Sequence, residues 1–523
     1  MSSMESRKSV VVLDFGGQYA HLIARRIREL NFYSKLLPYD ISLEDLQRSN
    51  PAAVVFSGGP ASVLEKDAPR PREEVVSFLL RNKIPILGVC YGHQLIASFF
   101  GGRIARKEKG EYGSSVLRVV EKNELFLDTP SIQRVWMSHR DSVVELPSDL
   151  VVLASTDYSE VAAYKHRTLP AYGVQFHPEV KHTEHGKTIL SNFLRRVVGL
   201  TPNWFIEDEA MHIIEEMRKN IKGKVLLAVS GGVDSLTTAL MLQKAIGGEN
   251  LYLIHVNTGL LRENESERVL EILKKLGFTN VHYVDASKLF LERLRGVTDP
   301  EEKRRIIAKT FAEVFKDKAL QLSHTVGGFK YLAQGTIYPD RVESGATGKA
   351  TAKIKSHHNV VMEAIPGLEL VEPLAEFYKD EVRRIAEILG LPEELVKQHP
   401  FPGPGLAVRV LGEVTEEKLK ILRKATMIVE EEFRKAGLYE KVWQAFPVLL
   451  PVKSVGVKGD VRSYEYVLAL RVVESEDAMT ASFVKLPWDF LEKLAERLVN
   501  EVDGVNRVLY DITHKPPATI EFE

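Results

Sequence analysis

Residues 224–240 read KVLLAVSGGVDSLTTAL, a stretch in which Val and Leu lead into two glycines and an apolar helical pattern begins directly after Ser235. This order predicts a buried strand, a tight turn and the N-terminus of a helix. The glycines let the backbone come close to a ligand, and the first N–H groups of the helix favour an anion. With the hydroxyl groups of Ser230 and Ser235 as further donors, the stretch predicts a phosphate-binding loop.

The loop does not follow the Walker pattern, because no Gly-Lys-Ser/Thr sequence ends it, so transfer of a γ-phosphoryl group is the less natural interpretation. The hexapeptide Ser-Gly-Gly-Val-Asp-Ser at 230–235 resembles the PP-loop of ATP pyrophosphatases. That resemblance implies an adenylylating enzyme that splits ATP between its α and β phosphates. The ATP-binding residues that it implies are Ser230, Gly231, Gly232, Val233, Asp234, Ser235 and Leu236. An ordinary glycine turn is the alternative.

Length and charge limit what the chain does. With 523 residues it is too long for one core, and domain-size statistics predict about three domains. Its 70 basic and 71 acidic residues leave a formal charge of −1, which gives no overall attraction for nucleic acid or an anionic membrane.

No apolar run approaches the ~20 residues of a membrane helix, and residues 1–9 lack the apolar core of a signal peptide. A single cysteine, Cys90, excludes intrachain disulfides and thiolate zinc clusters and favours a cytoplasmic location.

The N-terminal part of the chain repeats a pattern of strand, glycine turn and helix. The pattern begins at Ser9, its strand and turn recur in residues 53–60, and the complete pattern returns in residues 84–99. Strands that alternate with helices predict a doubly wound, mostly parallel sheet, with its site at the carboxyl ends of the strands. Cys90 lies at one of these ends, where a sharp turn exposes the side chain and the helix N-terminus stabilises a thiolate. A buried structural cysteine is the alternative.

A second stretch, AYGVQFHPEV at 171–180, supplies partners for a nucleophile. His177 and Glu179 leave the same face of a segment that Pro178 keeps extended. The imidazole can take the proton of the Cys90 thiol while the carboxylate orients the ring.

The segments GVCYGHQ at 88–94 and QFHPE at 175–179 together resemble the class I glutamine amidotransferases. The resemblance implies that residues 8–199 form an amidotransferase domain that hydrolyses glutamine. It implies a catalytic triad of Cys90, His177 and Glu179, oxyanion donors at the backbone N–H groups of Gly59 and Tyr91, and contacts to glutamine from Gln94, Ser138 and His139.

Residues 200–398 again alternate between strand and helix patterns, which predicts a second α/β domain around the phosphate-binding loop. Between Gly335 and Pro366 the periodicity is lost. Loops this long are functional or disordered, and four basic residues, Lys349, Lys353, Lys355 and His357, favour a lid over phosphates, with Lys353 and Lys355 as its main candidates. A flexible surface loop is the alternative.

The third expected domain, residues 399–523, begins with HPFPGPGL, which cannot continue a helix or a sheet. Two long strands joined by a turn at 458–460, one helix and a last strand predict a small α+β domain. The chain ends HKPPATIEFE, and its adjacent prolines predict an extended tail that holds Lys515 and Glu521 at defined positions.

Further motifs resemble those of the glutamine-hydrolysing GMP synthetase family. They are GLLR at 259–262, GTIYPD at 335–340, KSHHNV at 355–360, HPFPGPGL at 399–406 and the KPPATIEFE ending. The resemblance implies that ammonia from glutamine converts XMP to GMP through an adenylyl-XMP intermediate, with release of AMP and pyrophosphate. ATP is then a substrate, Mg²⁺ a cofactor with Asp234 as a ligand, and the third domain forms a homodimer.

The residues that the resemblance assigns to XMP are Arg262, Asp340, Lys458, Lys515 and Glu521. Lys458 matches a position that varies among relatives, and Asn257 stands where relatives usually carry Asp. The expected fold class is therefore α/β, with two doubly wound, mostly parallel-sheet domains followed by a small α+β dimerisation domain.

Two alternative functions remain at this point. NAD synthetase, or another PP-loop enzyme that forms amides, shares the loop but does not predict the KPPATIEFE ending. A non-catalytic nucleotide sensor with an amidotransferase fold would have a broken triad, whereas Cys90, His177 and Glu179 are all present.

Overall fold

The structure is a computed structural model that describes residues 7–345, 367–475 and 480–523, except for the side chains of residues 342–345 and Lys458. The expected lid residues, Lys353 and Lys355, lie outside the described residues. The chain forms two compact units, Met1–Phe205 and Ile206–Glu523, which are called unit 1 and unit 2 below.

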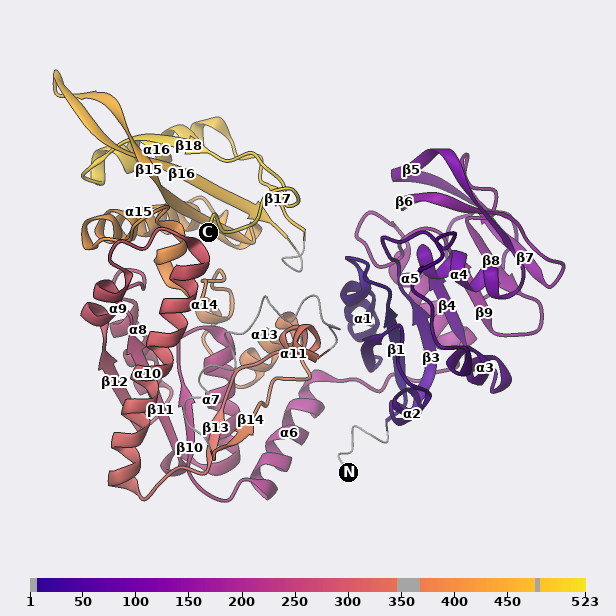
Figure 1. Ribbon diagram of the computed structural model, residues 1–523, viewed down its shortest axis with the longest axis horizontal. Coiled ribbons are helices and arrows are strands. Elements are labelled where there is room, and N and C mark those ends of the chain that lie inside the picture. The colour runs from indigo at the N-terminus through magenta and orange to yellow at the C-terminus, as the bar shows by residue number, and fades with distance from the viewer. Residues whose placement is uncertain (1–6, 346–366, 476–479) are drawn as a thin grey trace. The chain divides into compact units, whose positions relative to one another are not determined.

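Unit 1 is built on a nine-stranded mixed sheet in the order β2-β1-β3-β4-β9-β8-β7-β5-β6 (Figure 1). Its parallel half consists of β1 (Ser9–Asp14), β2 (Ser34–Pro38), β3 (Pro51–Phe56), β4 (Ile86–Val89) and β9 (Ala171–Val174). The accompanying helices are α1 (Ala20–Glu29), α2 (Leu43–Arg48), α3 (Glu73–Arg81), α4 (Tyr91–Phe99) and α5 (Gly186–Asn192), which runs into a π-helical turn, η1 (Phe193–Val197). The central strands are almost fully buried, which explains their continuous apolar sequences.

The other half of this sheet is antiparallel. It consists of β5 (Arg103–Val119), β6 (Ile132–Glu145), β7 (Leu150–Ser155) and β8 (Ala163–His166). The sequence analysis predicted no antiparallel half of this sheet. Along β6 buried and exposed residues alternate, whereas β5 has only two buried residues, Glu111 and Leu117. The exposed positions of both strands carry many charged residues, so no continuous apolar run marks them.

Close backbone packing lets α4 begin directly at the carboxyl end of β4. A methyl group on Gly88 would lie 2.4 Å from the Gly92 carbonyl oxygen, and one on Gly92 would lie 2.2 Å from the carbonyl oxygen of Phe56. Neither position has room for a side chain, so the helix, β4 and β3 meet through their main chains. The turn between β4 and α4 contains Cys90.

Unit 2 contains a fully parallel five-stranded sheet in the order β12-β11-β10-β13-β14. Its strands are β10 (Val225–Ala228), β11 (Leu251–Asn257), β12 (Val281–Asp285), β13 (Tyr331–Ala333) and β14 (Glu369–Val371). The helices of this part are α6 (Ile206–Asn220), α7 (Val233–Ile246), α8 (Glu265–Lys275), α9 (Ser287–Leu294), α10 (Pro300–Val326), α11 (Tyr338–Gly345), α13 (Lys379–Ile388) and α14 (Glu393–Val396), with the 3-10 turn η2 (Gly248–Asn250). The expected alternating α/β pattern is present.

A second sheet completes unit 2. It joins β15 (Gln444–Lys458), β16 (Val461–Glu474), β17 (Ser482–Phe483) and β18 (Val505–Tyr510), with β18 parallel to β16 and the other pairs antiparallel. The turns η3 (Gly405–Arg409) and η4 (Tyr439–Lys441) precede it, and α15 (Glu416–Lys435) and α16 (Trp488–Glu501) pack on it (Figure 1). One apolar core extends from the parallel sheet to these two helices. The boundary expected at residue 399 therefore lies within one compact unit, and the three-domain division stays a prediction.

The face of this sheet opposite the helices is partly covered by residues 511–523, which we call the tail. Ile520 and Phe522 of the tail pack on Phe446, Val448 and Ala469. The tail turns and bends from Pro516 onward, so the expectation of an extended ending was wrong. The reason is that side-chain and main-chain contacts with the sheet, described below, set its course.

Among the described residues, no helix is both long enough and apolar enough to cross a membrane.

Because the Gly92 packing sets the start of α4, we expect Gly92→Ala to lower the free energy of unfolding by about 1–3 kcal/mol through overpacking. Thermal unfolding of the full chain, followed by circular dichroism, measures the effect as a lower midpoint of the transition of unit 1. Gly403→Ala is the control, since no atom of the described part of the chain lies within 4 Å of the added methyl group. Equal midpoints for both variants would contradict the packing argument.

Candidate active sites

Cys90 holds a strained backbone conformation in the turn between β4 and α4, with φ 53° and ψ −102°. Non-glycine residues rarely adopt a positive φ, and such strain concentrates at functional sites. The Cys90 N–H donates to the Val174 carbonyl at 2.9 Å, which ties the turn to β9. The thiol lies 3.6 Å from the Ser138 carbonyl, to which it donates. The cysteine is thus held at the carboxyl ends of the parallel strands.

His177 and Glu179 follow β9 and form a buried pair beside Cys90. The His177 Nδ1 lies 2.7 Å from the Glu179 Oε1. A methyl group on Gly58 would lie 3.1 Å from the His177 Cε1 and 3.6 Å from the Cys90 Cβ, so both side chains border the same space. The main-chain N–H of His177 donates to the Trp136 carbonyl at 3.0 Å. The three residues expected to form a triad are therefore neighbours.

The surroundings of His177 favour its protonated form. Burial lowers the pKa of His177, but the charges of Glu179 and Cys90, together with hydrogen bonds to both, outweigh burial and raise it to about 10. An imidazolium between a carboxylate and a sulfur atom stabilises a thiolate and can later return a proton to a leaving group.

The residues expected to contact glutamine lie around Cys90 in different environments. Gln94 is buried on α4, and its Nε2 donates to the Asp141 carbonyl at 2.7 Å. Ser138 is exposed on β6. His139, the next residue, is buried, and its Nε2 lies 3.1 Å from the Glu111 Oε2.

Of the two expected oxyanion donors, Gly59 lies in a glycine-rich loop and Tyr91 lies at the N-terminus of a helix. Tyr91 is the first residue of α4, immediately after Cys90. A methyl group on Gly59 would come within 2.8 Å of the Phe15 carbonyl oxygen, so this backbone has no room for a side chain.

The phosphate-binding loop connects β10 to α7, as expected. Gly231 has φ +88°, and a methyl group there would meet the Val269 Cγ2 at 2.3 Å. The Ser235 hydroxyl donates to the Gly232 carbonyl at 3.0 Å and lies 3.2 Å from the Ser230 Oγ, which accepts from the Gly232 N–H at 3.3 Å. These bonds curl the loop around the N-terminus of α7, and Ser230 and Gly232 are exposed to an incoming ligand.

Asp234 of the loop pairs with a cation that the sequence analysis missed. Its Oδ2 lies 2.5 Å from the Lys379 Nζ at the start of α13. Its Oδ1 is buried and has no hydrogen-bond partner among the described residues. Gly335, after β13, also lies against Asp234, since a methyl group on it would be 3.3 Å from the Asp234 carbonyl carbon. The described residues contain no group of three or more His, Cys, Asp or Glu side chains placed to hold a metal ion.

Two of the five residues expected to bind XMP belong to one cluster. Glu521 accepts two hydrogen bonds from the buried Arg409, at 2.8 and 3.0 Å. The Arg409 guanidinium lies 5.2 Å from the centre of the Phe401 ring, and that of Arg262 lies 4.3 Å from the same ring. The Arg262 Nε lies 3.3 Å from a carboxylate oxygen of Glu430. Phe401 thus links Arg262 to Glu521.

The other expected XMP residues lie elsewhere. An Asp340 carboxylate oxygen accepts from the Ile337 N–H at 3.3 Å at the start of α11. Lys515 forms a backbone bridge with Ala481, its N–H donating at 2.7 Å. The Lys458 side chain lies outside the described atoms. Among the described side chains, the contacts above join only Arg262 and Glu521 to one cluster.

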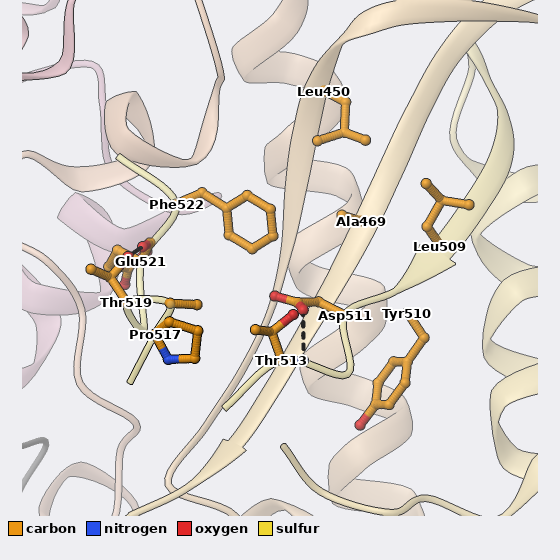
Figure 2. Close-up of a pocket in the computed structure, with 11 residues that line it drawn as sticks. Leu450, Ala469, Leu509, Tyr510, Asp511, Thr513, Pro517, Thr519, Glu521 and Phe522 are labelled. Atoms are coloured by element: carbon orange, nitrogen blue, oxygen red, sulfur yellow. Dashed lines mark hydrogen bonds between the residues drawn. The ribbon is translucent and has the colours of Figure 1, made fainter. Parts of the chain in front are cut away.

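A cavity of about 610 Å³ lies between the tail and the second sheet of unit 2. Figure 2 shows Leu450, Ala469 and Leu509 on its sheet side and Glu521 and Phe522 on its tail side.

Arg471, another residue that the sequence analysis missed, anchors the tail. It is fully buried and donates to the carbonyls of Thr513 at 2.6 Å and Thr519 at 2.9 Å, and it pairs with Asp511 at 3.1 Å. A lone arginine in the apolar run LALRVV of β16 was a signal that could have identified it. No comparable signal marked Lys379.

At the atomic level, Asn257 has a structural role. Its side chain accepts from the Gly259 N–H at 3.0 Å and donates to the Tyr283 hydroxyl at 3.2 Å, so it closes the turn after β11.

Comparison with known proteins gives matches along the chain. The family model for glutamine amidotransferase class I matches residues 11–197, that for NAD synthase matches residues 205–303, and that for the GMP synthase C-terminal domain matches residues 431–522. A glutamine-hydrolysing GMP synthase of Thermosipho melanesiensis is 52% identical over 524 residues, covering 99% of this chain and 100% of the relative. One of Aquifex aeolicus is 50% identical over 521 residues, with 99% and 100% covered. The chain belongs to the glutamine-hydrolysing GMP synthase family.

This membership confirms the family expected from the motifs. The NAD synthase match ends at residue 303, whereas the GMP synthases match nearly the whole chain. Among solved structures, a glutamine amidotransferase of Thermotoga maritima is 20% identical and covers 37% of this GMP synthase family member and 99% of its own chain, with a TM-score of 0.31.

The raised pKa of His177 gives a prediction for Glu179→Gln. In the unaltered protein we expect His177 to titrate near pH 10, because burial is outweighed by Glu179 and Cys90. Removing the Glu179 charge shifts the midpoint toward the ordinary value of 6.5. Nuclear magnetic resonance of histidine-labelled protein measures both midpoints.

The sign of the effect on stability follows from the same shift. The native state binds a proton that the unfolded state releases, so the stabilisation is complete below pH 6.5 and is lost as the pH rises through about 10. Glu179→Gln weakens this dependence. An unchanged His177 midpoint in the variant would contradict the assigned cause.

Proposed function

We propose that this chain makes GMP from XMP, ATP and glutamine, with release of AMP, pyrophosphate and glutamate, at two chemically separate sites. Unit 1 hydrolyses glutamine, and unit 2 adenylylates XMP and replaces the adenylyl group with ammonia. The observation that supports the proposal most strongly is family membership over the whole chain, combined with a strained Cys90 next to a His177–Glu179 pair.

In unit 1, the Cys90 thiolate attacks the side-chain carbonyl carbon of glutamine. His177 holds the proton and gives it to the departing ammonia, while Glu179 keeps the ring oriented. The N–H groups of Gly59 and Tyr91 face the oxyanion, and Gln94, Ser138 and His139 surround the substrate. Water then releases glutamate from the thioester.

In unit 2, the loop from Ser230 to Leu236 holds the phosphates of ATP. Oxygen on a purine carbon is a poor leaving group, and its adenylylation lets AMP depart instead, so the loop needs donors to pyrophosphate rather than a nucleophile. The unpartnered Asp234 Oδ1 fits Mg²⁺, which commonly binds one or two carboxylates together with substrate phosphates. Mg²⁺ would supply charge neutralisation of the phosphates, and Lys379 places a second cation at the loop.

XMP is proposed to contact Arg262, Asp340, Lys458, Lys515 and Glu521, and Lys353 and Lys355 to close over the phosphates. The cluster around Phe401 supports the roles of Arg262 and Glu521. The guanidinium groups of Arg262 and Arg409 both lie near the Phe401 ring, which offers XMP a rigid surface close to Arg262 and to the Glu521 bound by Arg409. Arg471 fixes the tail that carries Lys515.

A homodimer is proposed through the β15–β16 hairpin. Val455 and Val457 share one face of the hairpin with Tyr464, and their exposed fractions are 61%, 69% and 66%. Figure 1 shows the hairpin extending beyond the helices of unit 2. Adjacent exposed apolar side chains of this kind favour a protein interface. A cytoplasmic location and domains of residues 8–199, 200–398 and 399–523 complete the proposal.

The division between two sites is tested with Cys90→Ala. We expect this variant to lose glutamine-dependent GMP synthesis and to keep synthesis from ammonium salts, more so at higher pH, because no neighbouring group replaces the thiol. GMP, AMP and pyrophosphate are measured with XMP present and absent. A double variant, Asp234→Ala with Ser235→Ala, is the matched control and should fail with both nitrogen sources. A folded Cys90→Ala protein that binds ATP and XMP but fails with ammonium would overturn the proposal.

The phosphate loop is tested with Gly232→Val. Among the described residues, a methyl group on Gly232 has one close neighbour, the Ser230 Oγ at 3.4 Å, so the fold tolerates a side chain there. The valine would instead fill the space that pyrophosphate needs beside the backbone N–H groups. We expect adenylylation to be abolished, as measured by XMP-dependent AMP release, while glutamine hydrolysis continues. Normal ATP affinity in the variant would remove the loop from the site.

A further inference from the structure

Glu111 and His139 form a buried pair, and the proposed reaction gives Glu111 no role. Glu111 lies on β5 and His139 on β6, and each side chain is 4% exposed. The two strands pair antiparallel, with Glu111 directly opposite His139. His139 follows Ser138, whose carbonyl accepts from the Cys90 thiol. His139 is therefore the chain neighbour of a residue that contacts the nucleophile, Cys90.

Both ring nitrogens of His139 face hydrogen-bond acceptors. Nδ1 lies 2.9 Å from the Asp141 carbonyl oxygen, which can only accept, and 3.4 Å from the Ser142 hydroxyl, which can donate or accept. Nε2 lies 3.1 Å from the Glu111 carboxylate. A neutral imidazole has one N–H and can satisfy only one of these groups. The two shorter contacts, to the Asp141 carbonyl and to Glu111, are both hydrogen bonds only if the pair carries a second proton, either on the ring or on Glu111.

The surroundings of Glu111 assign that proton to the ring. Burial raises the pKa of Glu111, but the hydrogen bond from His139 and the nearby hydroxyl groups of Ser115 and Thr156 outweigh burial and hold the pKa below its usual value. Glu111 thus stays a carboxylate, and His139 donates from both nitrogens.

The donor on Nδ1 connects the pair to the residues around Cys90. The Asp141 carbonyl that accepts from His139 also accepts from the Gln94 Nε2 at 2.7 Å. The same Nε2 donates to the Gln175 Oε1 at 3.1 Å. Gln94 lies one helical turn after Cys90, so these contacts set which way its amide points.

We propose that Glu111 is a positioning residue of the glutamine site. By occupying Nε2 of His139, it keeps Nδ1 as a donor to the Asp141 carbonyl and so fixes the Ser138–Asp141 segment and the Gln94 amide around the substrate. Glu111 itself touches no reacting atom. The inference rests on the proposed hydrolysis of glutamine at Cys90.

Two substitutions of similar size separate this role from simple packing. In Glu111→Gln, the amide can donate to Nε2 of a neutral ring, which leaves the proton on Nδ1, so we expect the KM for glutamine to stay within about threefold. In Glu111→Leu that constraint is lost, and we expect the KM for glutamine to rise about tenfold or more. Ammonium-dependent GMP synthesis should be unchanged in both variants and reports on folding.

A folded Glu111→Leu protein with an unaltered KM for glutamine would overturn the proposal, as would a Glu111→Gln variant as impaired as Glu111→Leu. Nitrogen-15 magnetic resonance of histidine-labelled, unaltered protein tests the proton count independently of any variant, with His139→Gln assigning the signal. We expect protons on both nitrogens, and an unprotonated Nε2 would refute the pair as described. A failure of the proposed function would be recognised by a different result. In that case Cys90→Ala would leave glutamine-dependent GMP synthesis unchanged.

Discussion

Both candidate sites depend on a glycine turn at which a buried parallel strand passes directly into a helix. In unit 1 the Gly92 Cα lies against the carbonyl of Phe56, and in unit 2 Gly231 lies against Val269. A side chain at Gly92 would push α4 away from the sheet, and one at Gly231 would collide with the Val269 side chain of α8. The close approach places the first N–H groups of each helix at the carboxyl ends of the strands, where ligands of open α/β sheets bind. A thiol occupies one turn and hydroxyl groups the other.

Buried cations organise the rest of unit 2. Arg471 and Arg409 satisfy their donors with main-chain carbonyls and carboxylates of the tail. Lys303 of α10 is fully buried and donates to the Val410 carbonyl at 2.8 Å and to Glu523. A buried charge is costly unless it is paired and hydrogen-bonded. The tail supplies those partners, so it is a structural part of the unit.

The sequence predicted the features that depend on local pattern. The turns at Cys90 and at Ser230 lie where glycines follow apolar runs, and the two-residue spacing of His177 and Glu179 gave a pair on one face. Features that depend on contacts between distant residues could not be predicted. The Glu111–His139 pair joins positions 28 residues apart on strands whose alternating charges hid them, and Lys379 reaches Asp234 across 145 residues. The course of the tail was mispredicted from its prolines because Arg471, far away in sequence, determines it.

The ion pair between Lys379 and Asp234 has a consequence for the order of events at the loop. A cation waiting beside an empty anion pocket normally attracts small counterions from solution, which an incoming nucleotide must displace. Here the carboxylate of the loop serves as an internal counterion, tethered in place. If phosphate oxygens of a nucleotide replaced Asp234 beside Lys379, both oxygens of Asp234 would become available to the Mg²⁺ proposed above. Arrival of the nucleotide would thereby create the metal ligand, and the metal would have little reason to bind the loop alone.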